Sequence, residues 1–435
     1  MRIAMFTPSL GPDALGWQVH RDFADAVRAL GHEFALLTTP RPGNDPAGRA
    51  GGDRFGDSPR TAATPAGFDP VTSPAPGPGK DSDIRVLPVN NGRLLAELGR
   101  PFLRTRQLLP AAGALARHLR AHGNRIDLLH LEVAYPHATA GALGAWRSGW
   151  RGPIAVTPMG EDILVLRDRS YGMRRYPLPA GLVSWTLRRA AALRCISPLA
   201  ERRIATLSPA NPRRVIPLNV SAEAAAAALR TDAERARFRA DSRVRVDADF
   251  GTAGRPLVLS FGRLHPFKGI DYLIDAAAAI GDAIVLVVGP SATVRPVGDV
   301  AEALQRQAER LGVADKVVIA GAVHPSRALQ LLAAADAVVV PSPLESLNKV
   351  CMEAAAVGTP FIVTETTGIS AWVPQEGVGI VVPPRNPAVI AWAIEEIVAG
   401  HFAYDAAAAA RFAQQFSPRA VAEQVLAFYR EVAGR

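Results

Sequence analysis

The sequence has few cysteines and no long hydrophobic run. Its two cysteines, Cys195 and Cys351, are far apart and each lies within an apolar segment. Such a pair does not make a disulfide framework, which favours a reducing compartment. No segment approaches the roughly 20 consecutive apolar residues that a membrane-spanning helix requires. The sequence therefore predicts a cytoplasmic protein that is soluble or attached only to a membrane surface.

A secretory leader is not expected either. The opening segment MRIAMFTPSL has an apolar run that is too short for a signal peptide and reaches Pro8 at once, so it is predicted to form the first strand. The 435 residues, with 49% hydrophobic content, exceed what one core usually supports. Two domains of similar size are expected.

Charge is divided unevenly between the two halves of the chain. Residues 1–219 hold 29 Lys and Arg against 17 Asp and Glu, a net charge of +12, whereas residues 220–435 hold 20 against 23, a net charge of −3. Two basic stretches of the first half contain Arg104, Arg106, Arg117 and Arg120, and then Arg167, Arg169, Arg174, Arg175, Arg188 and Arg189. They fit an anionic acceptor or an acidic membrane surface, or they are ordinary solvated faces. Nucleic acid is not expected as a partner.

The segment Pro341–Pro360, PSPLESLNKVCMEAAAVGTP, places two glutamates just after a predicted buried strand at 337–340. A helix is expected to follow, with Ser346 as its N-cap. Ligands of open α/β sheets bind beyond the carboxyl ends of strands, so Glu345 in the loop could reach a sugar ring. Glu353, about 12 Å further along if the intervening residues are helical, could bind ribose hydroxyls, and the helix start could bind an anion. Two solvated glutamates are the ordinary alternative.

A second group of candidate residues lies in Leu257–Ala277, LVLSFGRLHPFKGIDYLIDAA. A strand is predicted to end at Gly262 and a helix to begin near Ile270. Arg263 and Lys268 share the loop between them, and together they suit a pyrophosphate, because arginine offers a fork of donors and lysine a compact charge. The glycines of this loop would let the backbone approach phosphates closely. The alternative is a solvated loop whose cations pair with nearby acids.

Both groups, in this order and about 80 residues apart, resemble the retaining, nucleotide-sugar-dependent glycosyltransferases of family 4. Further segments that look like the family are Gly16–Thr39, Ile126–Glu132, Arg213–Ser221, Gly377–Val398 and the closing Phe416–Val432. The resemblance implies the α/β arrangement called GT-B, in which two Rossmann-like domains face each other across a cleft and a C-terminal helix returns to the first domain.

The resemblance also implies roles for individual residues. Arg263 and Lys268 would bind the donor diphosphate and stabilise the leaving nucleotide, which is electrostatic catalysis that needs no metal. Glu345 would lie near the donor sugar. The implied donor-binding residues are Gly16, Gly262, Val323 in the loop after Gly321, Ser346, Leu347, Asn348, Lys349, Val350 and Glu353. His20 matches a histidine that the family often carries in its first helix, although a packing role is the ordinary alternative for a lone histidine.

Two departures from the family pattern affect substrate identity. The family often shows His-Gly-x-Asp where this chain has Met159-Gly160-Glu161-Asp162. Methionine cannot hydrogen-bond a sugar hydroxyl as imidazole can, so contacts on this side would come from Glu161 or Asp162. The glycine-rich run that follows the first glutamate in the family is replaced by residues 346–349. Lys349 opposes the helix dipole there, which favours a role in binding an anion over a role in helix stability.

The predicted domains are 1–219 for the acceptor, 220–415 for the nucleotide sugar and 416–435 for the returning helix. Residues 40–84, rich in proline and glycine, are expected to form a mobile insertion in the first domain. The triplet Asp81-Ser82-Asp83 within it, and the pair Asp247 and Asp249, look like the metal-binding D-x-D of other glycosyltransferases. Both are rejected as metal sites, because the first lies in this insertion and the family does not depend on metal.

The sequence thus predicts a metal-independent, retaining glycosyltransferase without a resident cofactor. Its donor is expected to be a nucleoside diphosphate sugar, with uridine as the commonest base in the family and guanosine or adenosine open. The acceptor is not identified, and an anionic or lipid-linked molecule fits the basic first half. A nucleotide-sugar epimerase on the same architecture and a catalytically silent nucleotide-binding protein are the two alternatives.

Overall fold

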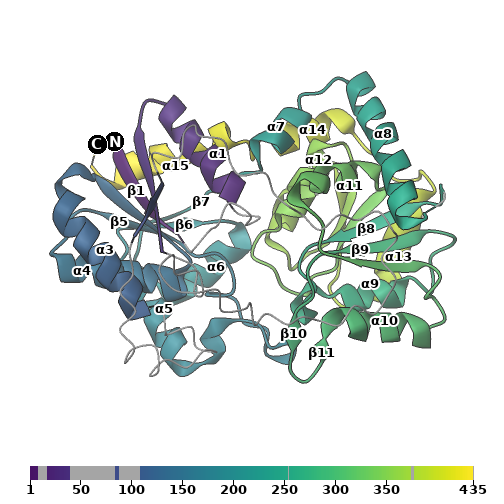
Figure 1. The fold of residues 1–435 in the computed structure, drawn as a ribbon, viewed down its shortest axis with the longest axis horizontal. Coiled ribbons are helices and arrows are strands. Elements are labelled where there is room, and N and C mark those ends of the chain that lie inside the picture. Colours follow the sequence, from purple (N-terminus) through teal and green to yellow (C-terminus); the bar gives the residue numbers. More distant parts are fainter. Residues whose placement is uncertain (8–16, 40–83, 88–107, 253, 374–376, 435) are drawn as a thin grey trace, which may run out of the picture.

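Two parallel β-sheets organise the chain, which the computed structural model describes at residues 1–7, 17–39, 84–87, 108–252, 254–373 and 377–434. The sheets lie in two domains placed next to each other (Figure 1). The first has seven strands in the order β3-β2-β1-β4-β5-β6-β7, and the second has six in the order β12-β9-β8-β13-β14-β15. This is the two-domain α/β architecture predicted from the sequence.

The strands are short, and the central ones of each sheet are buried. Those of the first sheet are β1 (Arg2–Phe6), β2 (Glu33–Thr38), β3 (Ile84–Val86), β4 (Leu128–Glu132), β5 (Ile154–Thr157), β6 (Ala192–Cys195) and β7 (Arg213–Val215). Those of the second are β8 (Leu257–Phe261), β9 (Ile284–Val288), β12 (Val317–Gly321), β13 (Ala337–Val340), β14 (Phe361–Thr364) and β15 (Gly379–Val382). A separate antiparallel pair is formed by β10 (Thr293–Val294) and β11 (Gly298–Asp299).

Helices cover both faces of the first sheet. Along β1, Ile3 and Met5 point to one face, while Ala4 and Phe6 point to the other, as the two-residue period of a strand requires. The first face is covered by α1 (Trp17–Ala29) and α15 (Pro418–Val432). The other is covered by α3 (Leu108–His122), α4 (Thr139–Ser148) and α5 (Pro177–Arg189), which lie below the sheet in Figure 1.

The second sheet is covered in the same way. One face packs against α9 (Ile270–Ala276), α10 (Val300–Arg310) and α13 (Pro387–Val398). The other packs against α8 (Asp232–Phe250), α11 (Ala328–Ala334), α12 (Lys349–Ala356) and α14 (Ala406–Gln414). Because both faces are buried, the strands are near-continuous hydrophobic runs such as AVVV in β13.

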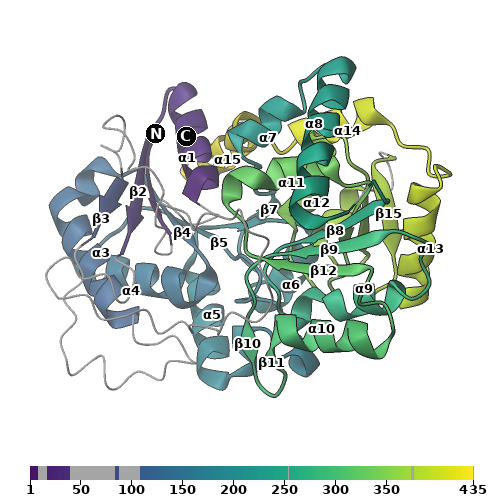
Figure 2. The same cartoon turned by 45° about the vertical axis from the view of Figure 1, so that its right-hand side comes forward.

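The chain passes between the domains at two adjacent places. After β7 it enters α7 (Ala222–Ala227), and after α14 it returns through α15. The Val220 N–H donates to the Phe416 carbonyl over 2.9 Å, so the two crossings are bonded to each other. On the first domain, Val421 and Val425 of α15 pack with Phe23 of α1. The predicted return of the C-terminal helix is confirmed, and the two termini lie close together (Figure 2).

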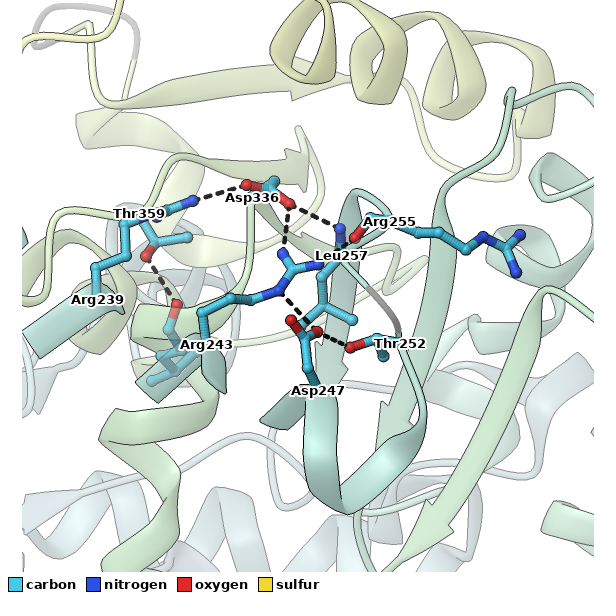
Figure 3. A network of polar contacts seen from close by, with 9 residues as sticks. Arg239, Arg243, Asp247, Thr252, Arg255, Leu257, Asp336 and Thr359 are labelled. Carbon is cyan, nitrogen blue, oxygen red and sulfur yellow. Dashed lines mark hydrogen bonds and ion pairs between the residues drawn. The ribbon is translucent and has the colours of Figure 1, made fainter. Parts of the chain in front are cut away.

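An ion-pair network fastens α8 to the second sheet (Figure 3). Asp336, just before β13, accepts from Arg239 at 2.8 Å and from Arg243 at 3.0 Å, and its carboxylate also accepts the Leu257 N–H at 2.7 Å. Arg243 also pairs with Asp247 at 2.9 Å. Both aspartates of the second D-x-D pair are therefore engaged in ion pairs: Asp247 with Arg243 within α8, and Asp249 with Arg327.

Other sequence predictions have mixed outcomes. No helix in the described part of the chain is long and apolar enough to cross a membrane. Cys195 and Cys351 are both buried and free. Of the insertion predicted at 40–84, only Ile84, which begins β3, lies within the described residues. Arg104 and Arg106 also lie outside the described residues.

Candidate active site

The loops that follow β8 and β13 meet at the carboxyl edge of the second sheet. Gly269 has a φ of +67°, and a Cβ added to it would lie 2.3 Å from the Pro341 carbonyl oxygen. Only glycine allows this approach without displacing backbone. The contact holds the Arg263–Lys268 loop against the segment that carries Glu345, 77 residues beyond Lys268 in the chain.

Lys268 and Glu345 form a shielded ion pair. The Lys268 Nζ lies 2.5 Å from Glu345 Oε1, and their side chains are 20% and 14% exposed. The second oxygen, Oε2, accepts from Ser342 at 2.9 Å and from Asn348 at 3.1 Å. Burial by itself would raise the pKa of Glu345, but the Lys268 charge and these hydrogen bonds outweigh it, so the pKa is lowered. Glu345 is therefore an anion fixed beside a cation.

Arg263 supplies a second cation on the same loop. Its side chain is exposed, it has no hydrogen bond or ion pair with the described residues, and its guanidinium lies 5.8 Å from the centre of the Phe267 ring. A small pocket at the ends of β8 and β13 is lined by Gly262, Arg263, Lys268, Ser342 and Asn348. The structure thus brings together the predicted phosphate-binding cations and one wall of a pocket beside Glu345.

The start of α12 differs from the prediction. Its N-cap is Asn348, whose side chain accepts from the Cys351 N–H at 3.2 Å, and not Ser346. Ser346 instead donates its hydroxyl to the Met159 carbonyl of the first domain at 2.5 Å. The Ser346 carbonyl accepts from Ser197 of the same domain at 2.5 Å. Ser346 is occupied in joining the domains, so the helix begins two residues later.

Other predicted donor residues occupy different environments. Glu353 is half-buried on α12, and its carboxylate has no hydrogen-bond partner among the described residues. Burial raises the pKa of Glu353 against the opposing charge of Lys349. Leu347 is buried in the core, with Val350 packed against it. Val323 is half-buried in the loop after β12, and Gly16 lies outside the described residues.

A buried acid that sequence reasoning missed lies on the first-domain wall. Glu132 at the end of β4 is 3% exposed in its side chain, and its Oε2 lies 2.6 Å from His20 Nε2. The Thr7 hydroxyl donates to the same oxygen over 2.8 Å. Burial would raise the pKa of Glu132, but His20 and Thr7 lower it to about 2. The only sequence signal was an acidic residue that ends the apolar strand LLHLE.

The buried pair makes stability depend on pH. Because the pKa of Glu132 falls from 4.5 to about 2, its contribution is present above pH 4.5 and is lost as pH falls toward 2. The shift corresponds to about 3 kcal/mol of unfolding free energy. We expect wild type to lose more stability than Glu132→Gln over this range, measured by denaturant unfolding at several pH values. Parallel pH curves for the two proteins would contradict this role.

A cavity of about 110 Å³ separates this pair from α12. Its walls include His20, Glu132, Met159 and Arg194 from the first domain and Lys349 from the second. Arg194 is 2% exposed and donates from Nε to the Ile216 carbonyl over 3.1 Å. Lys349 therefore faces the first domain. The cavity is lined by both positively and negatively charged side chains, and apolar side chains such as Val19 and Phe23 form the rest of its wall.

The predicted sugar contacts at 161–162 separate into two environments. Asp162 is fully buried and its carboxylate accepts backbone N–H groups from Gly160 at 2.7 Å, Met159 at 3.1 Å and Ala134 at 2.5 Å. It shapes the loop from within and does not face the cleft. Glu161 is half-buried, and its carbonyl accepts the Met173 N–H over 2.7 Å.

Aromatic stacking and ion pairs also join the two domains. Tyr171 stacks on Phe267 with ring centres 4.0 Å apart. Arg169 pairs with Asp271 at 2.8 Å, and Arg385 pairs with Asp168 at 2.7 Å. Arg169 is thus part of an interdomain contact, although the sequence placed it in a basic patch. Within the described residues, no group of three or more His, Cys, Asp and Glu is placed to hold a metal ion.

Two family models match the chain and together cover both domains. Residues 16–219 match the Glycosyl transferase 4-like domain, and residues 247–415 match Glycosyl transferases group 1. Among curated relatives, an uncharacterized glycosyltransferase of Methanocaldococcus jannaschii is 36% identical over 33% of this chain and 35% of its own length. A D-inositol 3-phosphate glycosyltransferase of Mycobacteroides abscessus is 35% identical over 42% of this chain and 41% of its own. The matches thus span less than half of these relatives.

Solved structures match over the whole chain. Sucrose-phosphate synthase from Thermosynechococcus elongatus has a TM-score of 0.72 at 22% identity and covers 100% of both chains. Anabaena HepE in complex with UDP and glucose has a TM-score of 0.69 at 18% identity, over 99% of this chain and 100% of its own. At these identities the likeness is one of fold, and it extends through both domains.

Proposed function

Because the chain belongs to the GT-B glycosyltransferases of the family 4 type, we propose that it transfers a sugar from a nucleoside diphosphate sugar to an acceptor hydroxyl with retention of configuration. The observation that carries the proposal is the Lys268–Glu345 pair beside Arg263, at the carboxyl edge of the second sheet. Uridine is proposed as the base, and this is supported by the similar structures of Anabaena HepE in complex with UDP and with UDP-glucose.

The cations act on the leaving group. As the bond between sugar C1 and the phosphate oxygen breaks, negative charge grows on the nucleoside diphosphate. Lys268 is fixed by Glu345 close to the predicted position of that charge, in a site partly shielded from water, where such stabilisation has its largest effect. Arg263 is exposed on the same loop and adds a second positive charge. We assign Glu345 to the donor sugar, since Lys268, Ser342 and Asn348 hold its carboxylate in place.

Retention is proposed to follow from attack on the same face that the leaving group departs. The acceptor oxygen forms its bond to C1 on that face, and its proton passes to a phosphate oxygen of the leaving nucleotide. No protein base is then required, and positioning and charge stabilisation provide the catalysis. No metal has a role in this scheme.

The acceptor is proposed to bind on the first domain and to carry an anionic group or a lipid-linked headgroup. The +12 charge of residues 1–219 supports this, as does the cavity between His20, Glu132 and Lys349. Some curated relatives are named for a phosphorylated acceptor, D-inositol 3-phosphate. A lipid-linked acceptor would add peripheral contact with an acidic membrane to a cytoplasmic protein.

Donor binding is tested by thermal stabilisation of the full chain. A sugar nucleotide at a hundred times its dissociation constant should add about 2.7 kcal/mol to the unfolding free energy. Uridine, guanosine and adenosine diphosphate sugars are compared, with an Arg263→Ala/Lys268→Ala variant as the control that should not respond. Stabilisation of that variant equal to wild type would place the donor elsewhere.

Product analysis separates transfer from the alternatives. An epimerase would convert the donor with no acceptor present, which chromatography of the sugar nucleotide detects. A silent binding protein would be stabilised by nucleotide but would show neither transfer nor slow donor hydrolysis. Anomer-resolved NMR of the product then decides between retention and inversion.

A further inference from the structure

A second cavity, of about 410 Å³, opens at the other edge of the first sheet. It is formed where β1 and β2 begin, beside β3, the ends of α1 and α3, and the residues that precede β4. Ile126, which lines this cavity, precedes β4, whereas Glu132 of the cleft wall ends it. The length of the five-residue strand therefore separates the cavity from the cleft wall by roughly 17 Å. This cavity is separate from the site described above.

Basic side chains line this cavity. They are Arg2, Arg28, Arg85, Arg125, His32, His118 and His122, and the one acidic residue in its described lining is Glu33. Two of the arginines are already engaged: Arg2 pairs with Asp127 at 2.9 Å, and Arg28 pairs with Asp25 at 2.9 Å. The other two, Arg85 and Arg125, are exposed, and their guanidinium groups have no hydrogen bond or ion pair with the described residues.

Two histidines of α3 lie next to each other in the same wall. The ring centres of His118 and His122 are 4.9 Å apart. Burial, with the nearby His122 and Arg85, lowers the pKa of His118 to about 4, so its imidazole is neutral at pH 7. The neutral His118 ring still offers one N–H donor. The floor of the cavity is apolar, with Ile3 and Phe34 buried below the basic rim.

We propose that this cavity binds a compact anion carrying a phosphate or similar dianionic group, held by Arg85 and Arg125 with the His118 and His122 rings. Two arginines whose side chains have no partner among the described residues offer paired donors to such an oxyanion. The neighbouring imidazoles add donors, and the apolar floor fits the remainder of a small organic phosphate. The volume lies within the range of small-molecule sites.

Sulfate is a suitable probe, because it stays a dianion between pH 5 and 8. The full chain is titrated with sulfate and followed by the imidazole proton signals in NMR, in the Arg263→Ala/Lys268→Ala background so that the cleft cations do not contribute. We expect binding to persist there and to weaken about tenfold or more when Arg85→Gln and Arg125→Gln are added.

The matched control is Arg151→Gln, an exposed arginine that precedes β5 at the same sheet edge but lies outside the cavity lining. It should leave sulfate affinity unchanged. Equal affinities in the Arg85→Gln/Arg125→Gln and Arg151→Gln proteins would overturn the proposal, as would loss of binding in the cleft background alone. Melting temperatures confirm that each variant is folded.

A pH series provides a second, independent readout. An anion beside His118 favours its protonated form, so sulfate should bind more tightly at pH 5 than at pH 8. His122 and Arg85 act directly on the pKa of His118. The other charged and titratable groups that line the cavity with it are Arg2 of β1, Glu33 of β2, Arg28 of α1, His32 after α1 and Arg125 after α3. His118→Gln should reduce this pH dependence, and an unchanged dependence in that variant would contradict the assigned geometry.

Discussion

Lys268→Ala is expected to lower turnover by about 100- to 1000-fold while the protein stays folded. The Lys268 Nζ is held 2.5 Å from Glu345, so it is already oriented before the donor binds. Its loss removes a preorganised charge from the proposed leaving group. Steady-state and single-turnover rates, measured with the donor sugar nucleotide, test the effect on chemistry and on donor binding separately.

A structural explanation for that loss must be excluded. Without Lys268, the Glu345 carboxylate keeps its burial but loses its countercharge, which should lower the melting temperature. In the Lys268→Ala/Glu345→Gln protein the uncompensated charge is gone, so stability should recover while turnover stays low. The control for losing a lysine is Lys316→Ala, because within the described residues the Lys316 ammonium bonds to backbone carbonyls and to no acidic side chain. Near-normal turnover in Lys268→Ala would refute the phosphate site.

Much of the fold could be predicted because its signals are local. The AVVV run gave β13, and the glycines around Arg263 and Lys268 marked the end of β8 and the start of α9. Parallel strands buried on both faces leave such runs uninterrupted, and glycine marks where the backbone must approach another loop. The position of Arg263, Lys268 and Glu345 at one sheet edge then followed from topology.

What could not be predicted depends on contacts between distant segments. Glu132 lies 112 residues from His20, and no spacing rule connects them. Ser346 and Asn348 are both good N-cap residues, and a hydrogen bond from Ser346 to the other domain decided which one caps α12. Arg169 belonged to a basic run, yet it pairs with Asp271 more than 100 residues away. The sequence shows which residues are charged, but which of them form ion pairs depends on how the fold brings distant segments together.

Glu353→Gln is expected to weaken donor binding about tenfold while making the protein more stable at pH 7. A carboxylate accepts hydrogen bonds from ribose hydroxyls more strongly than an amide oxygen does, and the difference is roughly 1.4 kcal/mol. Stability should rise because burial raises the pKa of Glu353, which means that folding disfavours its charged form. That cost is present above its ordinary pKa of 4.5 and disappears as the group becomes protonated.

Opposite changes in stability and affinity distinguish a ligand-binding carboxylate from a structural one. The carboxylate of half-buried Glu353 has no hydrogen-bond partner among the described residues, so its burial is explained if a ligand supplies the partner. Calorimetry with donors that lack one ribose hydroxyl tests this directly: wild type should discriminate against them, and Glu353→Gln should discriminate less. Glu309→Gln on α10, an exposed glutamate, is the control. If Glu353→Gln keeps full discrimination, the ribose is bound by another group.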